Sequence, residues 1–423
     1  MMQTVPHSVK IYSAAPYFYN LKEKVGYTVR YIVRFDEEID GEALKNAFES
    51  TMKRYTYLRL KLVKGLFSDH LEYNDAPLVV LNTSEALTLG ERQTNGHLLA
   101  LTYKRRSIYV NNSHGILDGR GRAPFMKTLI YYYCILRYNE PVEMDNVNLE
   151  DSEIDPEEYR EPFMQKLPKR RHFGPGVSMP RAMKLSKMGL VKVSEPLVHC
   201  MRIDEKELMA WCKQHDATPN VAIAIMMNRA IHKLHPDSKL PIGASVSCDL
   251  RTTLNAPKSH WSLIFLLNLF YDKKIAKLDI NDQCTVYRGS IIMQSDPDVL
   301  ANATSVSKMF YSLVYHVPKP FKQLLCKIMF SVLEKPTTYT VNYSGKTTYG
   351  SCDKHIRGLY PETNCGYEMV IETTVAGGYF LLDISQMWKE DIYYEAFRSE
   401  LEANGIHSET TYIYDQRCTL LEP

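Results

Sequence analysis

One histidine in this chain stands where its side chain could carry a proton. His114 follows a run of polar and β-favouring residues at 106–112 and is followed at once by a glycine. Asp118 comes four residues later, and Gly119 and Gly121 follow it. Glycines at these spacings permit sharp backbone turns that a Cβ would block. A strand would fix the backbone of His114 while its ring faces a cavity, so the pattern indicates a general base.

A helix is predicted to follow this turn. Pro124 suits the first turn of a helix, because the missing N–H is not needed there. Asn139 is a plausible stop. The apolar positions that recur at helical spacing between them are Phe125, Met126, Leu129, Ile130, Tyr133 and Leu136.

The segments before His114 follow a recognisable order. Residues 29–35 read as a strand, Asp40 opens a helix, and residues 54–63 alternate like a strand. This order, together with the H-x-x-x-D-G motif from His114 to Gly119, resembles the CoA-dependent acyltransferase superfamily. That group includes chloramphenicol acetyltransferases, alcohol O-acetyltransferases and the condensation domains of peptide synthetases.

The second half of the chain extends the resemblance. A strand at 197–203, two helices and a strand at 242–247 lead to Asp249-Leu250-Arg251. The resemblance implies that Arg251 pairs with Asp118, which makes Asp118 structural. The planar guanidinium fork suits a buried carboxylate. It also implies a role for Ser344, before Gly345 at a strand end, as an oxyanion donor.

The resemblance implies a fold, a reaction and its substrates. The fold class is α/β, an α+β two-layer sandwich in each of two chloramphenicol acetyltransferase-like halves, which form a pseudo-dimer with a tunnel between them. The expected domains are 1–185, including an acidic and basic linker at about 140–185, and 186–423. The implied reaction is transfer of an acyl group, most simply acetyl, from acyl-CoA or a phosphopantetheine thioester to a small-molecule alcohol or amine. No tightly bound cofactor and no metal are expected.

Two departures from the family leave alternatives open. Peptide-synthetase condensation domains usually carry a second histidine directly before the catalytic one, but this chain has Ser113 there. The D-F-G-W-G motif of plant acyltransferases is absent. A stand-alone condensation enzyme that uses a carrier-protein thioester and a non-catalytic binding member of the family are the two alternatives.

The composition excludes several function classes. A net charge of +2 over 423 residues gives no reason to expect a nucleic-acid partner. We expect no signal peptide and no transmembrane segment, because no apolar run approaches the ~20 residues that span a bilayer. Nine scattered cysteines without a C-x-x-C pair are typical of a cytoplasmic protein with reduced thiols.

Three other features carry weaker signals. His232 and His235 lack a third zinc ligand at helical spacing, so we read them as helix C-terminal residues. The basic cluster Lys169-Arg170-Arg171 balances an acidic stretch, 140–161, which holds ten acids and one base. The amphipathic run at 321–330 is interpreted as a core-facing helix rather than a membrane contact.

Overall fold

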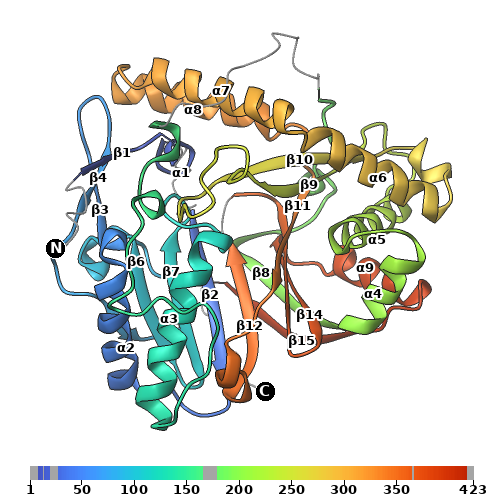
Figure 1. Cartoon of the computed structure of the whole chain (residues 1–423). Helices are drawn as coiled ribbons and strands as arrows, with labels where there is room; N and C mark the ends of the chain where they lie inside the picture. Colours follow the sequence, from blue (N-terminus) through green and yellow to red (C-terminus); the bar gives the residue numbers. More distant parts are fainter. Residues whose placement is uncertain (1–7, 13, 20–26, 165–178, 364–365, 417–423) are drawn as a thin grey trace.

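Two β-sheets, each built mainly from one half of the chain, form the framework of the molecule (Figure 1). The computed structural model describes residues 8–12, 14–19, 27–164, 179–363 and 366–416. Helices pack on the sheets, so the architecture is mixed α/β, as the sequence predicted.

The first sheet contains five strands in the order β12-β2-β7-β6-β5. Their bounds are Ile356–Thr363 (β12), Thr28–Phe35 (β2), Ser107–Ser113 (β7), Leu99–Lys104 (β6) and Val80–Asn82 (β5). Strand β5 runs parallel to β6, and the other neighbours are antiparallel. Helices α2 (Gly41–Arg54) and α3 (Gly119–Tyr138) pack against each other and cover one face (Figure 1).

The second sheet contains seven strands in the order β10-β9-β11-β13-β14-β8-β15. Their bounds are Ile264–Tyr271 (β10), Ile242–Asp249 (β9), Tyr339–Lys346 (β11), Met369–Ala376 (β13), Tyr379–Trp388 (β14), Lys192–Asp204 (β8) and Ser408–Asp415 (β15). Strand β11 runs parallel to both of its neighbours, and the other pairs are antiparallel. The second core lies between this sheet and the helices packed on it, among them α4 (Glu205–Gln214), α5 (Pro219–Leu234) and α9 (Ile392–Ala403).

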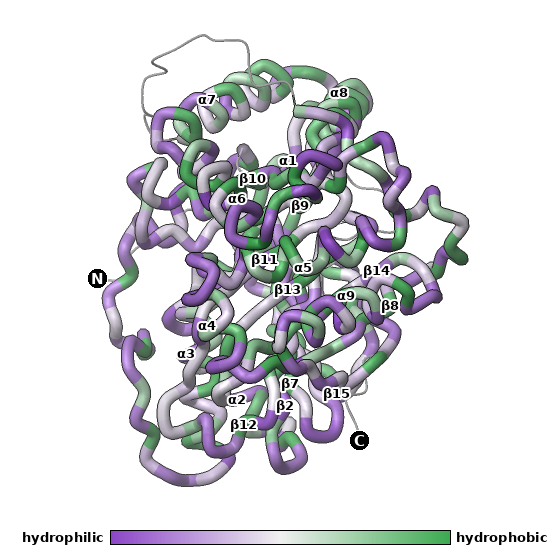
Figure 2. The backbone as a smooth tube through the Cα atoms, turned by 90° about the vertical axis from the view of Figure 1, so that its right-hand side faces the viewer, coloured by the Kyte–Doolittle hydropathy of each residue, from purple (hydrophilic) through white to green (hydrophobic). Residues whose placement is uncertain are grey.

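The remaining elements surround the two large sheets. A small sheet has the order β1-β4-β3, with bounds Ser8–Lys10, His70–Tyr73 and Leu60–Val63. The other helices are α1 (Ala15–Tyr19), α6 (Ile280–Gln294), α7 (Pro297–Val314) and α8 (Lys319–Leu333). Helices α7 and α8 lie at the top in both Figure 1 and Figure 2.

The two halves of the chain interlock. Strand β12 comes from the second half but pairs antiparallel with β2 of the first sheet, and it also contacts β13 and β14 of the second sheet. Buried residues of the second half, such as Leu250 and Trp261, belong to the same core cluster as Phe48 and Phe125. The domain boundary at residue 185 therefore stays a prediction, because one strand of the first sheet lies beyond it.

Three local expectations were wrong. Helix α3 begins at Gly119, with Asp118 as its N-cap, so Pro124 lies inside the helix rather than in its first turn. In the run at 54–63, only Leu60–Val63 is a strand, because α2 continues to Arg54 and a short 3₁₀ turn follows. The apolar side of the run at 321–330 faces outward, because the helix buries Lys322 and Cys326 instead.

Candidate active site

His114 lies directly after strand β7, where neighbouring segments hold its backbone. Its amide donates a hydrogen bond to the carbonyl oxygen of Tyr27 at 2.7 Å. The amide of Gly115 donates to Ser113 Oγ at 3.3 Å. A Cβ on Gly115 would stand 2.7 Å from the ring of Phe18, so glycine allows this close approach. The backbone of His114 is thus fixed at the strand end.

Asp118 uses both carboxylate oxygens within the protein. Oδ1 accepts hydrogen bonds from the Gly121 amide at 2.7 Å and from Arg251 Nη2 at 2.8 Å. Oδ2 accepts from Arg251 Nη1 at 2.9 Å and from the Leu263 amide at 3.0 Å. Both charged side chains are only 2% exposed. The ion pair expected from the resemblance is therefore present, and it is bidentate and buried.

The remaining donors of Arg251 bind its own loop. Nε donates to the carbonyl oxygen of Ser259 at 2.8 Å, and Nη2 donates to that of Trp261 at 2.9 Å. Nη1 also donates to Asp249 Oδ1 at 3.0 Å. The guanidinium therefore joins both ends of the loop between β9 and β10 to the first turn of α3. Because every nitrogen of the guanidinium is hydrogen-bonded, the cost of burying the charge is offset.

Two polar side chains meet the imidazole of His114. Ser262 Oγ, from the second half of the chain, lies 3.4 Å from His114 Nδ1. The hydroxyl of Tyr17 lies 3.1 Å from the same Ser262 Oγ. The ring of Tyr17 is tilted by 33° against the imidazole, with centroids 4.7 Å apart. The histidine therefore lies where the two halves meet, and the tunnel between them stays a prediction.

Burial lowers the pKa of His114 below its usual 6.5, because the charged imidazolium loses solvation. The negative charge of Asp118 and hydrogen bonds to the backbone of His114 and Leu117 oppose this shift, and Arg122 reinforces it. The net lowering favours the neutral ring at physiological pH. A neutral imidazole is the form that accepts a proton, so this environment suits a general base.

Asn112 shapes the turn between His114 and Asp118. Its Nδ2 donates to the carbonyl oxygen of Leu117 at 3.1 Å, and its Oδ1 accepts from Arg122 Nη1 at 3.3 Å. Asn112 is fully buried. A strand residue thus holds the far side of the turn in place.

Gly119 and Ser344 lie together, beside the turn. A Cβ on Gly119 would stand 3.6 Å from Ser344 Oγ, which is ordinary van der Waals contact. Ser344 is exposed in β11, where the pairing register shifts before Lys346. Among the described residues, the hydrogen-bond partners of His114 do not include Ser344. Its role as an oxyanion donor stays a prediction.

A buried network that the sequence did not reveal supports the Arg251 loop. Arg54 forms a bidentate ion pair with Glu158 at 2.7 and 2.9 Å. Tyr57 donates its hydroxyl proton to Glu158 Oε2 at 2.6 Å and lies 2.9 Å from His260 Nδ1. Burial lowers the pKa of His260 to about 4. Glu158 belongs to the acidic stretch that we interpreted as a linker, and only its i, i+3 capping pair with Asp155 marked it locally.

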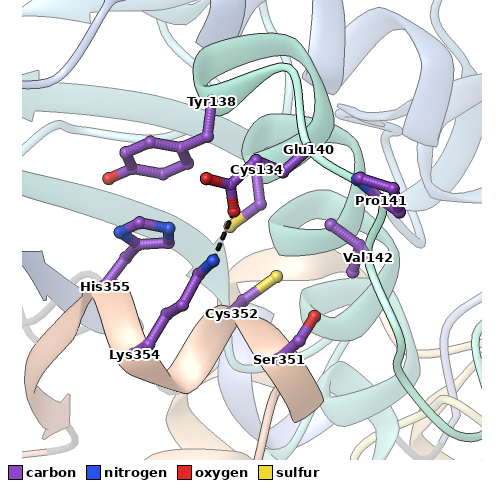
Figure 3. A pocket seen from close by; sticks show the side chains of 9 residues that line it. All are labelled: Cys134, Tyr138, Glu140, Pro141, Val142, Ser351, Cys352, Lys354 and His355. Carbon is purple, nitrogen blue, oxygen red and sulfur yellow. Dashed lines mark hydrogen bonds and ion pairs between the residues drawn. The ribbon is translucent and has the colours of Figure 1, made fainter.

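The thiols near α3 are poor nucleophile candidates. Figure 3 shows the sulfur atoms of Cys134 and Cys352 turned toward each other beside the Lys354–Glu140 ion pair. Hydrogen bonding to Cys352 and burial raise the pKa of Cys134, so the neutral thiol is favoured. Cys134 is also fifteen residues along α3 from Gly119, about 22 Å away at 1.5 Å per residue.

The remaining sequence candidates lie apart from His114. His235 Nε2 lies 2.7 Å from the Tyr393 hydroxyl, and the ring of His232 lies 5.6 Å from that of Tyr271. In the described part of the chain, no cluster of three His, Cys, Asp or Glu residues could hold a metal ion. The basic cluster at 169–171 lies outside the described residues. None of the helices within the described ranges is both long and apolar enough to span a membrane.

Comparisons with known proteins rest on structure alone. No family model matches the sequence, and no curated protein matches it. TRI101 of F. graminearum, solved with coenzyme A and deoxynivalenol, is 11% identical with a TM-score of 0.62, over 95% of this chain and 100% of its own. The polyketide synthase associated protein 5 from Mycobacterium tuberculosis is 14% identical with a TM-score of 0.60, over 94% and 98%.

A third similar structure is the first condensation domain of the calcium-dependent antibiotic synthetase, in complex with a substrate analogue. It is 12% identical with a TM-score of 0.61, over 94% of this chain and 95% of that domain. The chain has the fold of TRI101, of the polyketide synthase associated protein 5 and of this condensation domain. The resemblance read from the H-x-x-x-D-G motif is thus confirmed at the level of the fold. The fold spans nearly the whole chain and includes both halves.

Proposed function

We propose that this protein is an acyltransferase that moves an acyl group from a CoA thioester to an alcohol or amine. The observation that carries the proposal is the position of His114. Its imidazole lies at the meeting of the two halves, beside the loop that the buried Asp118–Arg251 pair holds in place. TRI101, which shares the fold, was solved with coenzyme A, and this supports the choice of donor.

In the proposed mechanism, His114 acts as a general base. We assign the proton of the acceptor to Nε2, since Nδ1 faces Ser262 Oγ at 3.4 Å. The acceptor oxygen or nitrogen attacks the thioester carbonyl, and the resulting tetrahedral intermediate collapses to the new ester or amide. The thiolate leaves and takes the proton from the imidazolium. General-base catalysis of this kind contributes roughly 10²–10⁴-fold.

Asp118 and Arg251 have a positioning role in this mechanism. Both oxygens of Asp118 are already hydrogen-bonded, so the carboxylate has no free site for a travelling proton. The pair instead holds the histidine turn and the Ser262 loop together. Ser344 and Gly119, which lie next to each other, are the proposed wall for the developing oxyanion.

A carrier-protein thioester is the second candidate donor, because condensation domains share this fold. The serine that replaces their usual second histidine, Ser113, favours free CoA thioesters. A binding protein without activity is the third candidate, and the intact His114 and Asp118 speak against it. A cytoplasmic site of action, inferred from the scattered cysteines, is part of the proposal.

The proposal is tested by a thiol-release assay. The purified protein is incubated with acyl-CoAs of different chain lengths and a panel of alcohols and amines, and free thiol is measured. We expect acceptor-dependent release of CoA. Release only from a carrier-bound thioester would favour the condensation alternative, and no release from either donor would contradict the proposed activity.

A further inference from the structure

Helix α8 presents its apolar side to the outside of the molecule. Phe321, Leu324, Ile328 and Val332 follow each other at intervals of three and four residues, so they lie on one face of the helix. All four are exposed, and Phe321 is 64% exposed. An amphipathic helix of a globular protein normally turns this face inward.

The buried side of α8 shows that this orientation is fixed. Lys322 is only 1% exposed, although lysine is almost never fully buried. Its ammonium donates to the carbonyl oxygens of Phe67 at 2.7 Å and Tyr315 at 2.8 Å, and also to Ser68 Oγ. A helix that rolled its apolar face inward would lose these three hydrogen bonds.

The apolar surface continues beyond α8. On α7, Val306, Met309 and Leu313 are exposed, and Leu313 is 69% exposed. Leu66, at the tip of the β3–β4 loop, is 81% exposed, and the loop meets α8 where the Lys319 amide donates to the Leu66 carbonyl at 3.4 Å. Both helices lie at the same end of the molecule in two perpendicular views (Figures 1 and 2).

Residues 299–333 contain four lysines and no aspartate or glutamate, although the whole chain is nearly balanced with 51 basic and 49 acidic residues. Lys322 is buried and Lys319 pairs with Asp69 at 2.8 Å, so Lys308 and Lys327 are the two lysines of this range that remain for the outer face. Lys327 is exposed and flanks the apolar stripe of α8. Amphipathic helices that bind membranes combine an apolar face with lysines that reach anionic lipid headgroups.

We propose that α7, α8 and the loop at 64–69 form a docking surface for an anionic lipid bilayer. The exposed face spans two helices and a loop tip at one end of the molecule, which suits an extended lipid surface. A second copy of the chain fits less well. A two-fold contact centred on α8 would bring Lys327 close to its own copy, with no acidic residue between Asp298, at the start of α7, and Glu334, after α8, to pair with it.

Vesicle co-sedimentation tests the docking surface without any enzyme assay. The full chain is mixed with vesicles of phosphatidylcholine alone and with equimolar phosphatidylcholine and phosphatidylglycerol. We expect binding to the anionic vesicles that weakens at high salt. Leu313→Glu combined with Ile328→Glu should lower the partition coefficient by at least about tenfold, because the changes place charge in the exposed apolar surfaces of α7 and α8.

The matched control introduces the same charges elsewhere. Met209→Glu with Ile413→Glu alters exposed apolar residues of α4 and β15, and Ile413 is 52% exposed against 53% for Ile328. This control should bind vesicles as the wild type does. Lys308→Glu with Lys327→Glu should weaken binding to anionic vesicles selectively. Circular dichroism and thermal melts check that every variant is folded.

Three outcomes would overturn the proposal. The first is that the wild-type chain fails to sediment with anionic vesicles. The second is that the Leu313→Glu, Ile328→Glu variant binds as well as the Met209→Glu, Ile413→Glu control. The third is a wild-type chain that forms a dimer in solution, binds no vesicles and becomes monomeric with Leu313→Glu and Ile328→Glu. That result would assign the surface to a second copy.

Discussion

At the scale of single residues, the sequence predicted the histidine and the turn that follows it, but it did not predict the side chains that contact the imidazole. His114, Asp118 and Arg251 each carry a local pattern, and the expected ion pair is present. Ser262 and Tyr17, which contact the imidazole, have no such pattern. Tyr17 lies 97 positions and Ser262 lies 148 positions from His114. Contacts over such separations depend on the packing of whole segments, which one sequence does not reveal.

Breaking the Asp118–Arg251 pair should destabilise the fold. Asp118→Asn or Arg251→Ala leaves one buried charge without its partner, which typically costs about 3–5 kcal/mol. Urea unfolding measures the loss, and a double variant should lose less than the sum of the two singles. Two single variants with wild-type stability and wild-type transfer rate would show that the pair has no such role.

His260 should make stability depend on pH. Burial lowers its pKa to about 4 in the folded state, from about 6.5 in the unfolded chain. Between these values the unfolded state binds more protons, so the free energy of unfolding falls as the pH falls through this window. The loss approaches roughly 3 kcal/mol, at 1.36 kcal/mol for each pKa unit.

The measurement for His260 is urea unfolding at several pH values across that window. His260→Asn, whose amide can still donate to the Tyr57 oxygen while the Tyr57 hydroxyl donates to Glu158, should flatten the dependence. His407→Asn is the control, because that side chain is 82% exposed. An equal slope in the His260 variant and the wild type would assign the pH dependence to other groups.

At the scale of elements, capping residues predicted where helices begin, whereas alternation of apolar and polar residues alone did not predict strands reliably. Asp40 caps α2 as expected, because its side chain accepts hydrogen bonds from the backbone amides of Glu42 and Ala43 in the first turn. The strand expected at 54–63 was mostly wrong, because helix propensity and a tight turn dominate before Leu60. The outward orientation of the apolar face of α8 was not predicted either. Helical periodicity shows that a helix has an apolar face, but it does not show whether that face is buried or exposed.

The first turn of α3 should tolerate a side chain at one glycine and not at the other. A Cβ on Gly121 would stand 2.0 Å from the carbonyl oxygen of His260, whereas one on Gly119 would stand 3.6 Å from Ser344 Oγ. Gly121→Ala must push the Arg251 loop away, at a cost of about 1–3 kcal/mol. The free energy of unfolding of Gly119→Ala should lie within about 0.5 kcal/mol of the wild-type value. Equal urea midpoints for both variants would contradict the close packing of the loop on α3.

At the scale of the whole molecule, the two-half organisation was predictable and the interlocking was not. The repeated order of strands and helices before His114 and before Arg251 indicated two related halves, and the structural comparisons agree with this. Strand β12 of the second half pairs with β2, which lies more than three hundred residues earlier in the chain. No local sequence pattern indicates this exchange of a strand between the halves. The exchange, together with the Arg251 loop, holds the halves together around His114.

The central claim is that His114 carries the proton during acyl transfer. The most direct test is the kcat of His114→Ala for a confirmed pair of substrates, measured by thiol release beside thermal melts and thioester binding. We predict a fall of at least about 10²-fold in kcat, with the fold and thioester binding retained and both substrates needed before thiol appears. A kcat within a few-fold of the wild type, or an acyl group trapped on a cysteine or serine during turnover, would contradict the claim.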